Sequence, residues 1–414
     1  MNTDKRNYLL LFLDPILYVS AMAFLSINAV IPNFLNELGA SAFQISLASA
    51  LAAIGTLVSQ PIFAQIAMSL PVKSQVFAKL LAVQRFSLLA YVLAIPFVSR
   101  HNPMLAVVLF LLFWGIFNLF VGCNSPFYMS ILSKVVPDNQ WGRLVGFADA
   151  AGNLTALGSA FVIGLLLKNM IFPYNYTWIF GIGLALLLLN ACCFALIKEK
   201  PEKVQKQPIN YFKYIAEIPH ALKTQKEFAV SVLGNSFLVV SNIALAFYSL
   251  AAIRIYDAGS EQVALFAGIG IIVNIFGSIL FGMIGDRVGH RYVLAIASFL
   301  SMSASVIVLT IPSLTAINVG FALSSLSLGG YNIGNGINIM DHCPKDQVPL
   351  YISINIMITL TASSLVTLMA GAVIDIFSFT PLFIFTGACG MAAFITFFRF
   401  NRASKSALKT DSQS

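Results

Sequence analysis

Charged residues are scarce in this sequence. Only 10% of its 414 residues are Asp, Glu, Lys or Arg, and 58% are hydrophobic. Soluble proteins carry about 25% charged residues, so the composition excludes an ordinary soluble fold. Twelve membrane-spanning helices of ~20 residues would use about 240 residues, which is close to 58% of the chain. The composition therefore predicts a multi-pass membrane protein with short loops and no sizeable soluble domain.

Cysteine and histidine are also scarce. The five cysteines are odd in number and lie mostly in apolar runs, and the four histidines are scattered, so neither a disulfide framework nor a metal-ligand spacing is present. No H-E-x-x-H or G-x-S-x-G motif indicates an enzyme, and no G-x-x-x-x-G-K-[ST] loop indicates ATP-driven pumping. We expect no catalytic residue, no metal and no cofactor. Two other classes are less favoured. An ion channel would need a pore loop, and a membrane-embedded enzyme would need a set of catalytic residues that converge inside the membrane; the sequence shows neither.

Long apolar runs are what the sequence has instead. They are continuous, unlike the alternating ~10-residue segments of a barrel, and this predicts an all-α membrane protein with twelve transmembrane helices. The first six runs cover 8–31, 45–68, 76–98, 104–127, 144–167 and 176–197. The other six cover 228–251, 263–284, 292–311, 314–339, 351–374 and 382–398.

One long hydrophilic stretch divides the runs into two groups of six. It covers 198–227 and holds seven lysines, so we predict a first half at 1–197, a cytoplasmic linker and a second half at 228–414 with a short cytoplasmic tail. With Arg85 set apart as membrane-embedded, twenty basic residues then fall inside, and only Arg100, Lys168 and Arg254 fall outside. This distribution predicts cytoplasmic termini and a plasma (inner) membrane location. It also explains the net charge of +8 without a nucleic-acid partner.

The turn after the eighth apolar run carries the most specific motif. It reads Gly282-Met-Ile-Gly-Asp286-Arg287-Val-Gly289-His-Arg291. The motif resembles the G-x-x-x-D-R-x-G-x-R signature of the major facilitator superfamily (MFS). A shift of 207 residues also lays Gly122, Pro137 and Gln140 on Gly329, Pro344 and Gln347, as expected for two repeated halves.

This resemblance implies two pseudo-symmetric six-helix bundles that rock around a midplane site in alternating access. It implies a secondary transporter, and we expect a monomer in the lipid bilayer that binds a small-molecule substrate. The motif residues, together with Asp341 at the end of the tenth run, are the candidates for holding the cytoplasmic side shut. They are Gly282, Asp286, Arg287, Gly289, Arg291 and Asp341.

The first half departs from the signature. In its equivalent turn, Ala64 to Lys73, Met68 stands where the acid should be and only the basic Lys73 survives. A charge-based latch in this half is therefore built differently or is absent. The fifth run also lacks the Gly-Pro of the antiporter signature, which weighs against the alternative function, a multidrug/proton efflux antiporter.

Three charged residues lie within the apolar runs of the first half: Asp14, Arg85 and Asp149. At 1.5 Å per residue they lie roughly 8 to 14 Å from the inner boundary, in one layer. Such charges need partners, a water path or a function. In the structural interpretation, Arg85 ties one acid into a helix contact. In the functional interpretation, the spare carboxylate carries a proton, with Asp14 favoured because first spans line the cavity in the family.

The family resemblance places spans one, four, seven and ten around a central cavity. Polar and aromatic residues near their midpoints are therefore candidates for substrate binding, and the alternative is helix packing through small residues and amide bonds. No unpaired cation lies at a span midpoint, so we predict an uncharged or amphipathic organic solute. The candidates are Trp114, Asn118, Asn242, Tyr331, Asn332 and Asn335.

Overall fold

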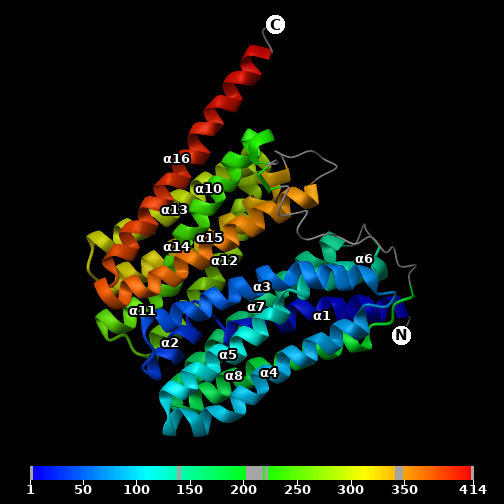
Figure 1. Ribbon diagram of the computed structural model, residues 1–414, viewed down its shortest axis with the longest axis vertical. Helices are drawn as coiled ribbons and strands as arrows, with labels where there is room; N and C mark the ends of the chain where they lie inside the picture. The colour runs from blue at the N-terminus through cyan, green and yellow to red at the C-terminus, as the bar shows by residue number, and fades with distance from the viewer. Residues whose placement is uncertain (1–2, 138–140, 202–217, 220–221, 341–347, 412–414) are drawn as a thin grey trace. The chain divides into compact units, whose positions relative to one another are not determined.

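The computed structural model describes residues 3–137, 141–201, 218–219, 222–340 and 348–411. Every long regular element in this part of the chain is an α-helix (Figure 1), as the apolar runs predict. The first eight helices are α1 (Thr3–Phe24), α2 (Val30–Glu37), α3 (Ala42–Ser69), α4 (Ser74–His101), α5 (Pro103–Val121), α6 (Asn124–Val135), α7 (Trp141–Asn169) and α8 (Tyr174–Leu196). The others are α10 (Lys226–Asn242), α11 (Ala244–Tyr256), α12 (Ser260–Val288), α13 (His290–Thr310), α14 (Leu314–Met340), α15 (Val348–Phe377) and α16 (Thr380–Asp411).

Eleven segments are long and apolar enough to cross a membrane, and two of them join a pair of consecutive helices, α5 with α6 and α10 with α11. The twelfth long helix is α14, in which twelve of 27 residues are Gly, Ser or Asn. Its polar composition explains why hydropathy alone ranks it below the others. The twelve spans follow the predicted order, and the all-α class is confirmed.

The chain forms two compact units. The first combines 1–209 with 259–271, and the second combines 210–258 with 272–414. Most of the predicted linker, at 202–217 and 220–221, lies outside the described residues. Its role as the boundary between halves stays a prediction.

Three spans are interrupted, which the apolar runs do not predict. The first span divides into α1 and α2, the fourth into α5 and α6, and the seventh into α10 and α11. At the first break the Ser26 carbonyl accepts hydrogen bonds from the N–H groups of Ala29 and Ile31, at 3.4 and 2.9 Å. These bonds turn the chain between the two helices.

The break in the fourth span lies against α3. A Cβ atom on Gly122 would lie 2.1 Å from Ser59 Oγ and 2.6 Å from the backbone nitrogen of Gln60. No side chain fits in this space, so glycine is what allows the two helices to approach so closely. Gly55 makes a second such approach, with Asn118 2.8 Å from its Cβ position.

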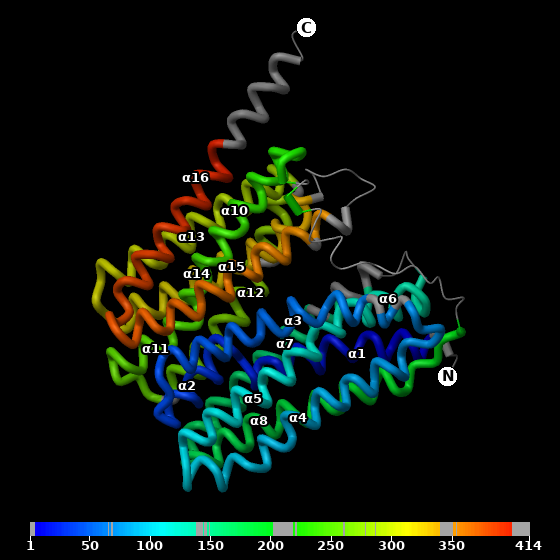
Figure 2. The backbone as a smooth tube through the Cα atoms, in the orientation of Figure 1, coloured from blue at the N-terminus to red at the C-terminus, as the bar shows by residue number. Residues whose placement is uncertain are grey.

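Within the first unit, α1 packs against α7 and α8, and α4 packs against α5 and α8 (Figure 1). Within the second unit, α13 packs against α14 and α16, and α10 packs against α15 and α16 (Figure 2). Each sixth span, α8 or α16, therefore contacts both the first and the third span of its half.

Candidate functional site

A cavity of about 490 Å³ lies inside the first unit. Helices α1, α3, α4, α5, α6 and α8 all contribute to its wall. The apolar part of the wall includes Phe77, Leu81, Val121, Met129 and Phe194. The polar part consists of Asp14, Tyr18, Thr56, Gln60, Arg85, Asn124, Ser125, Tyr128 and Asn190. The volume falls within the ~300 to 1,000 Å³ of typical small-molecule sites.

Two of the three predicted intramembrane charges meet at this cavity through an amide. The Asn190 side chain donates to the Asp14 carboxylate and, at 3.2 Å, to the Asp14 carbonyl. Its Oδ1 accepts a hydrogen bond from Arg85 Nη2 at 2.9 Å. Asn190 therefore joins α1 to α4 through α8, and we call this chain of three residues the charged tie.

The Arg85 guanidinium is fully buried, with 0% of the residue exposed. Besides Asn190, it donates to the Leu187 carbonyl at 3.3 Å and to the Gln84 side chain. Gln84 in turn donates to the Phe117 carbonyl of α5 at 3.0 Å. Neutral oxygens thus hold the cation between α4, α5 and α8, as a buried charge requires.

The Asp14 carboxylate lies at the edge of the cavity and is 9% exposed. Tyr18, one helical turn further along α1, is within hydrogen-bonding reach of Asn124 at the start of α6. The charged tie therefore lies beside the break of the fourth span. The side chain of the third predicted charge, Asp149 in α7, lies outside the part of the chain that the structure describes.

Sequence reasoning missed Asn190, although a signal was present. It is a single amide within the apolar segment Ala185 to Cys193, and an amide at membrane depth needs a partner as a charge does. What the sequence could not show is that this amide faces α1 and α4.

The two candidates in span four lie in the packing between α3 and α5. Trp114 is 1% exposed, donates from Nε1 to the Ala48 carbonyl at 3.0 Å, and stacks on Phe110 and Phe117. Asn118 donates to the Trp114 carbonyl at 2.8 Å. Neither side chain is part of the cavity wall in the first unit. Their role in substrate binding stays a prediction.

The second unit brings two of the span-ten candidates into an amide cluster. Asn335 Oδ1 accepts from Asn235 and Asn355, at 2.7 and 3.0 Å, and Asn335 Nδ2 donates to the Tyr331 hydroxyl at 3.0 Å. Asn235 also donates to Asn355 at 3.1 Å, and its own side-chain oxygen has no partner among the described residues. The cluster joins α10, α14 and α15 with uncharged groups.

The remaining span-seven and span-ten candidates lie apart from the hydrogen bonds of this cluster. Asn332 is exposed on α14. Asn242 ends α10 at the break of the seventh span and is 8% exposed. Within the described residues, neither atom of its amide has a hydrogen-bond partner. Asn242 therefore has donors and an acceptor left for another group.

The signature turn joins α12 to α13. Gly289 has a φ of 100°, a conformation that favours glycine, and Arg291 is 8% exposed whereas Arg287 is exposed. Gly282 has no other group within 4 Å of its Cβ position. The side chain of Asp286 and the whole of Asp341 lie outside the described residues. The gating role of these six residues stays a prediction.

Comparison with known structures shows the same fold. A mutant of the nucleoside transporter NupG aligns with a TM-score of 0.73 at 13% identity, over 96% of this chain and 99% of that one. A bacterial homologue of the iron transporter ferroportin aligns at 0.72 and 16% identity, over 95% and 98% of the two chains. The xylose transporter XylE from E. coli aligns at 0.67 and 15% identity, over 96% and 99%.

Comparison at the level of sequence identifies the family. No curated protein sequence matches the chain. The family pattern described as Major Facilitator Superfamily, however, matches residues 16–253 and 230–414 and so covers nearly the whole chain. This match agrees with the signature turn, the twelve spans and the transporters that share the fold. The chain belongs to the Major Facilitator Superfamily of membrane transporters.

Proposed function

We propose that this protein is a secondary active transporter that moves a small uncharged or amphipathic organic solute by alternating access, coupled to protons through Asp14. The observation that carries the proposal is the cavity of about 490 Å³ whose wall holds the charged tie. In this proposal the cavity receives the solute. We include the amide cluster around Asn335 in the proposal, because it is a set of uncharged hydrogen-bond donors and acceptors in the second unit.

The charges of the cavity support an uncharged or amphipathic solute. Of the described residues that line it, Asp14 and Arg85 are the two that carry a full charge, and their signs are opposite. Neutral oxygens of the protein already surround the guanidinium, so it is a poor anchor for an anion. Two of the proteins that share the fold are named as a nucleoside transporter and a xylose transporter, and we propose a neutral solute for this protein too.

The geometry of Asp14 supports its assignment to proton coupling. An ionised Asp14 accepts from Asn190, and the same amide accepts from Arg85. Protonation removes the negative charge at one end of this chain and weakens the hold of the carboxylate on the Asn190 amide. Because the three residues belong to α1, α8 and α4, the protonation state of one acid would change the contact among three helices. Asp149 is the second candidate.

The distribution of basic residues supports a plasma-membrane protein with both termini in the cytoplasm. In that orientation the signature turn lies on the cytoplasmic side. Asp286, Arg287 and Arg291, with Asp341, would then help to hold that side shut while the outside is open. We also propose that the protein is a monomer.

Efflux of amphipathic drugs in exchange for protons is the second candidate function. The observation in its favour is an acid in a cavity with aromatic and aliphatic walls, which suits a lipophilic cation. The buried guanidinium beside that acid weighs against it, because a cationic solute would be repelled.

Ligand binding separates these two functions. The purified protein is screened by thermal shift against nucleosides, sugars and lipophilic cations, because a ligand of the native state raises the apparent stability. Stabilisation by neutral polar solutes supports the first proposal, and stabilisation by lipophilic cations alone supports the second.

Proton coupling is then tested in proteoliposomes with the solute so identified. An imposed pH gradient should drive its accumulation in the native protein, and Asp14→Asn should abolish the effect of the gradient. Asp149→Asn tests the second candidate acid in the same unit. If both variants keep full gradient-driven transport, the proton proposal fails.

A further inference from the structure

The N-terminus of α4 lacks the residues that usually satisfy the first N–H groups of a helix. Its N-cap residue, Lys73, makes no side-chain capping bond, and the first turn holds no acid. The turn that precedes it also lacks the signature acid, since Met68 occupies that position. Free N–H groups and the helix dipole create a demand for negative charge at this end of α4.

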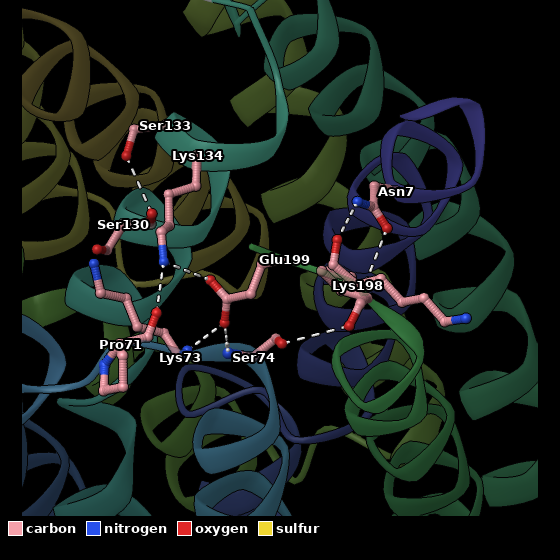
Figure 3. Close-up of polar contacts among 10 residues, drawn as sticks. Asn7, Pro71, Lys73, Ser74, Ser130, Ser133, Lys134, Lys198 and Glu199 are labelled. Carbon is pink, nitrogen blue, oxygen red and sulfur yellow. Dashed lines mark hydrogen bonds and ion pairs between the residues drawn. The ribbon is translucent and has the colours of Figure 1, made fainter. Parts of the chain in front are cut away.

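A carboxylate from another part of the chain meets this demand. Glu199 Oε1 accepts the backbone N–H of Ser74 at 2.6 Å and also that of Lys73 (Figure 3). Its other oxygen, Oε2, pairs with Lys134 Nζ at 3.2 Å. The Glu199 side chain is 0% exposed, so these contacts replace water around the charge.

Lys134 extends the contact to the turn between α3 and α4. It lies in the last turn of α6, and its Nζ also donates to the Pro71 carbonyl at 2.9 Å. One carboxylate therefore links the start of α4, the end of α6 and the turn that corresponds to the signature turn of the second half.

The neighbours of Glu199 contact α1 and α4 at this end of the unit. Lys198 and Asn7 of α1 exchange two hydrogen bonds, with the Lys198 N–H donating at 3.2 Å and the Asn7 amide donating at 2.7 Å (Figure 3). Ser74 Oγ lies 3.5 Å from the Ile197 carbonyl. The three residues that follow α8 are thus packed among α1, α4 and α6, and the last two of them are the first residues of the predicted linker.

We propose that Glu199 supplies to the first half the carboxylate that its signature turn lacks. The second half carries its acid, Asp286, within the signature motif, whereas in the first half the acid comes from the segment that follows the sixth span. Glu199 is then a positioning residue: it holds the turn and the adjoining helix ends together where the half meets the linker. Its contribution to gating rests on the proposed transport function.

Amide hydrogen exchange in the purified full-length protein tests this inference without any substrate. Glu199→Ala should raise the exchange rate of the segment that contains Lys73 and Ser74 about tenfold, because both N–H groups lose their acceptor. Glu199→Gln keeps an acceptor and should raise it less. The matched control is Glu261→Gln, which removes an acid from an exposed ion pair at 3.8 Å and should leave the segment unchanged.

Relocation of the acid separates this role from general destabilisation. Met68→Asp restores the signature acid, so in the Glu199→Ala background it should return the exchange rate of the segment toward the native value. An unchanged rate in Glu199→Ala, or no recovery with Met68→Asp, would overturn the inference. If Glu199→Ala does not fold, Glu199→Gln with and without Met68→Asp gives the same comparison.

Transport provides a separate readout in proteoliposomes. Loss of transport in Glu199→Ala and recovery with Met68→Asp would extend the role of the carboxylate to gating. A native protein that transports none of the screened solutes would contradict the proposed function and leave the exchange result intact. The two proposals can thus fail independently.

Discussion

The first, third and sixth spans are held together differently in the two units. In the first unit, α1, α4 and α8 meet through Asp14, Arg85 and Asn190. In the second unit, α10, α13 and α16 meet through hydroxyl groups, where Ser301 bonds to Ser241 at 2.6 Å and Ser241 donates to the Thr386 carbonyl at 2.8 Å. We call this set the hydroxyl tie.

The hydroxyl tie shows that charge is unnecessary for this helix packing. Arg85 and Ser301 are each the twelfth residue of their helix, yet one is a cation and the other is neutral. A charge at membrane depth costs at least ~2.5 to 3.5 kcal/mol on insertion scales. Because the second unit packs the equivalent helices without that cost, we expect the charge on Asp14 to serve the proposed function and Arg85 to hold the helices together.

The largest expected effect comes from Arg85→Met. The substitution leaves Asn190, Gln84 and the Leu187 carbonyl without their donor, and losing one partner of a buried polar set costs about 3 to 5 kcal/mol. Unfolding titrated with SDS measures the loss. The control is Arg100→Met on the same helix, where the exposed guanidinium lies over the Tyr174 ring. Equal stability of the two variants would show that the charged tie holds nothing together.

A moderate effect is expected from Gly390→Ala in the second unit. A Cβ atom there would lie 2.9 Å from both Ser241 Oγ and the Met302 nitrogen, so α16 must move away from the hydroxyl tie. Overpacking of this kind costs about 1 to 3 kcal/mol. Gly158→Ala is the control, since nothing lies within 4 Å of its Cβ position. If Gly390→Ala is as stable as the control Gly158→Ala, the hydroxyl tie does not depend on the close approach of the helices.

A small effect is expected from Ser241→Ala. The variant removes the central hydroxyl of the tie, and interhelical hydrogen bonds in membranes contribute about 0.6 kcal/mol on average. The same SDS titration gives the value, and transport should remain near the native rate. A loss as large as that of Arg85→Met would mean that the two ties are equally important for stability, and the contrast between the units would disappear.

The smallest change in stability is expected from Asp14→Asn. The new amide still offers an oxygen to Asn190 and removes a buried charge, so the free energy of unfolding should change by less than it does in Ser241→Ala. Near-native stability combined with lost proton coupling would separate the functional charge from the structural one. A strongly destabilised Asp14→Asn protein would instead assign the acid to packing.

Much of the fold could be predicted from the sequence, because continuous apolar runs and charge asymmetry respond directly to the lipid solvent. The order of twelve spans and the location of Asp14 and Arg85 in one layer both follow from counting residues. The interruptions of three spans could not be predicted, since glycine and serine, the residue types of Gly122 and Ser26, also occur elsewhere in these helices without interrupting them. Their effect depends on which neighbour lies opposite.

The site was harder to predict for the same reason. Asn190, Asn235 and Asn355 each look like an isolated amide in an apolar run, and only tertiary packing shows that they join charged or amide partners from two other helices. Glu199 lies in a charged stretch that reads as solvated linker. Its burial depends on a contact with residues more than a hundred positions earlier.

That separation sets an order of events during synthesis. The acceptor of the Ser74 N–H, Glu199, is synthesised 125 residues later. At ~5 to 20 residues per second, the interval between the synthesis of α4 and that of its cap is about 6 to 25 s. The cap arrives only when the sixth span is complete and before any of the second half exists. The synthesis of Glu199 is thus the point in translation at which the first half can cap the N-terminus of α4 with its own residues.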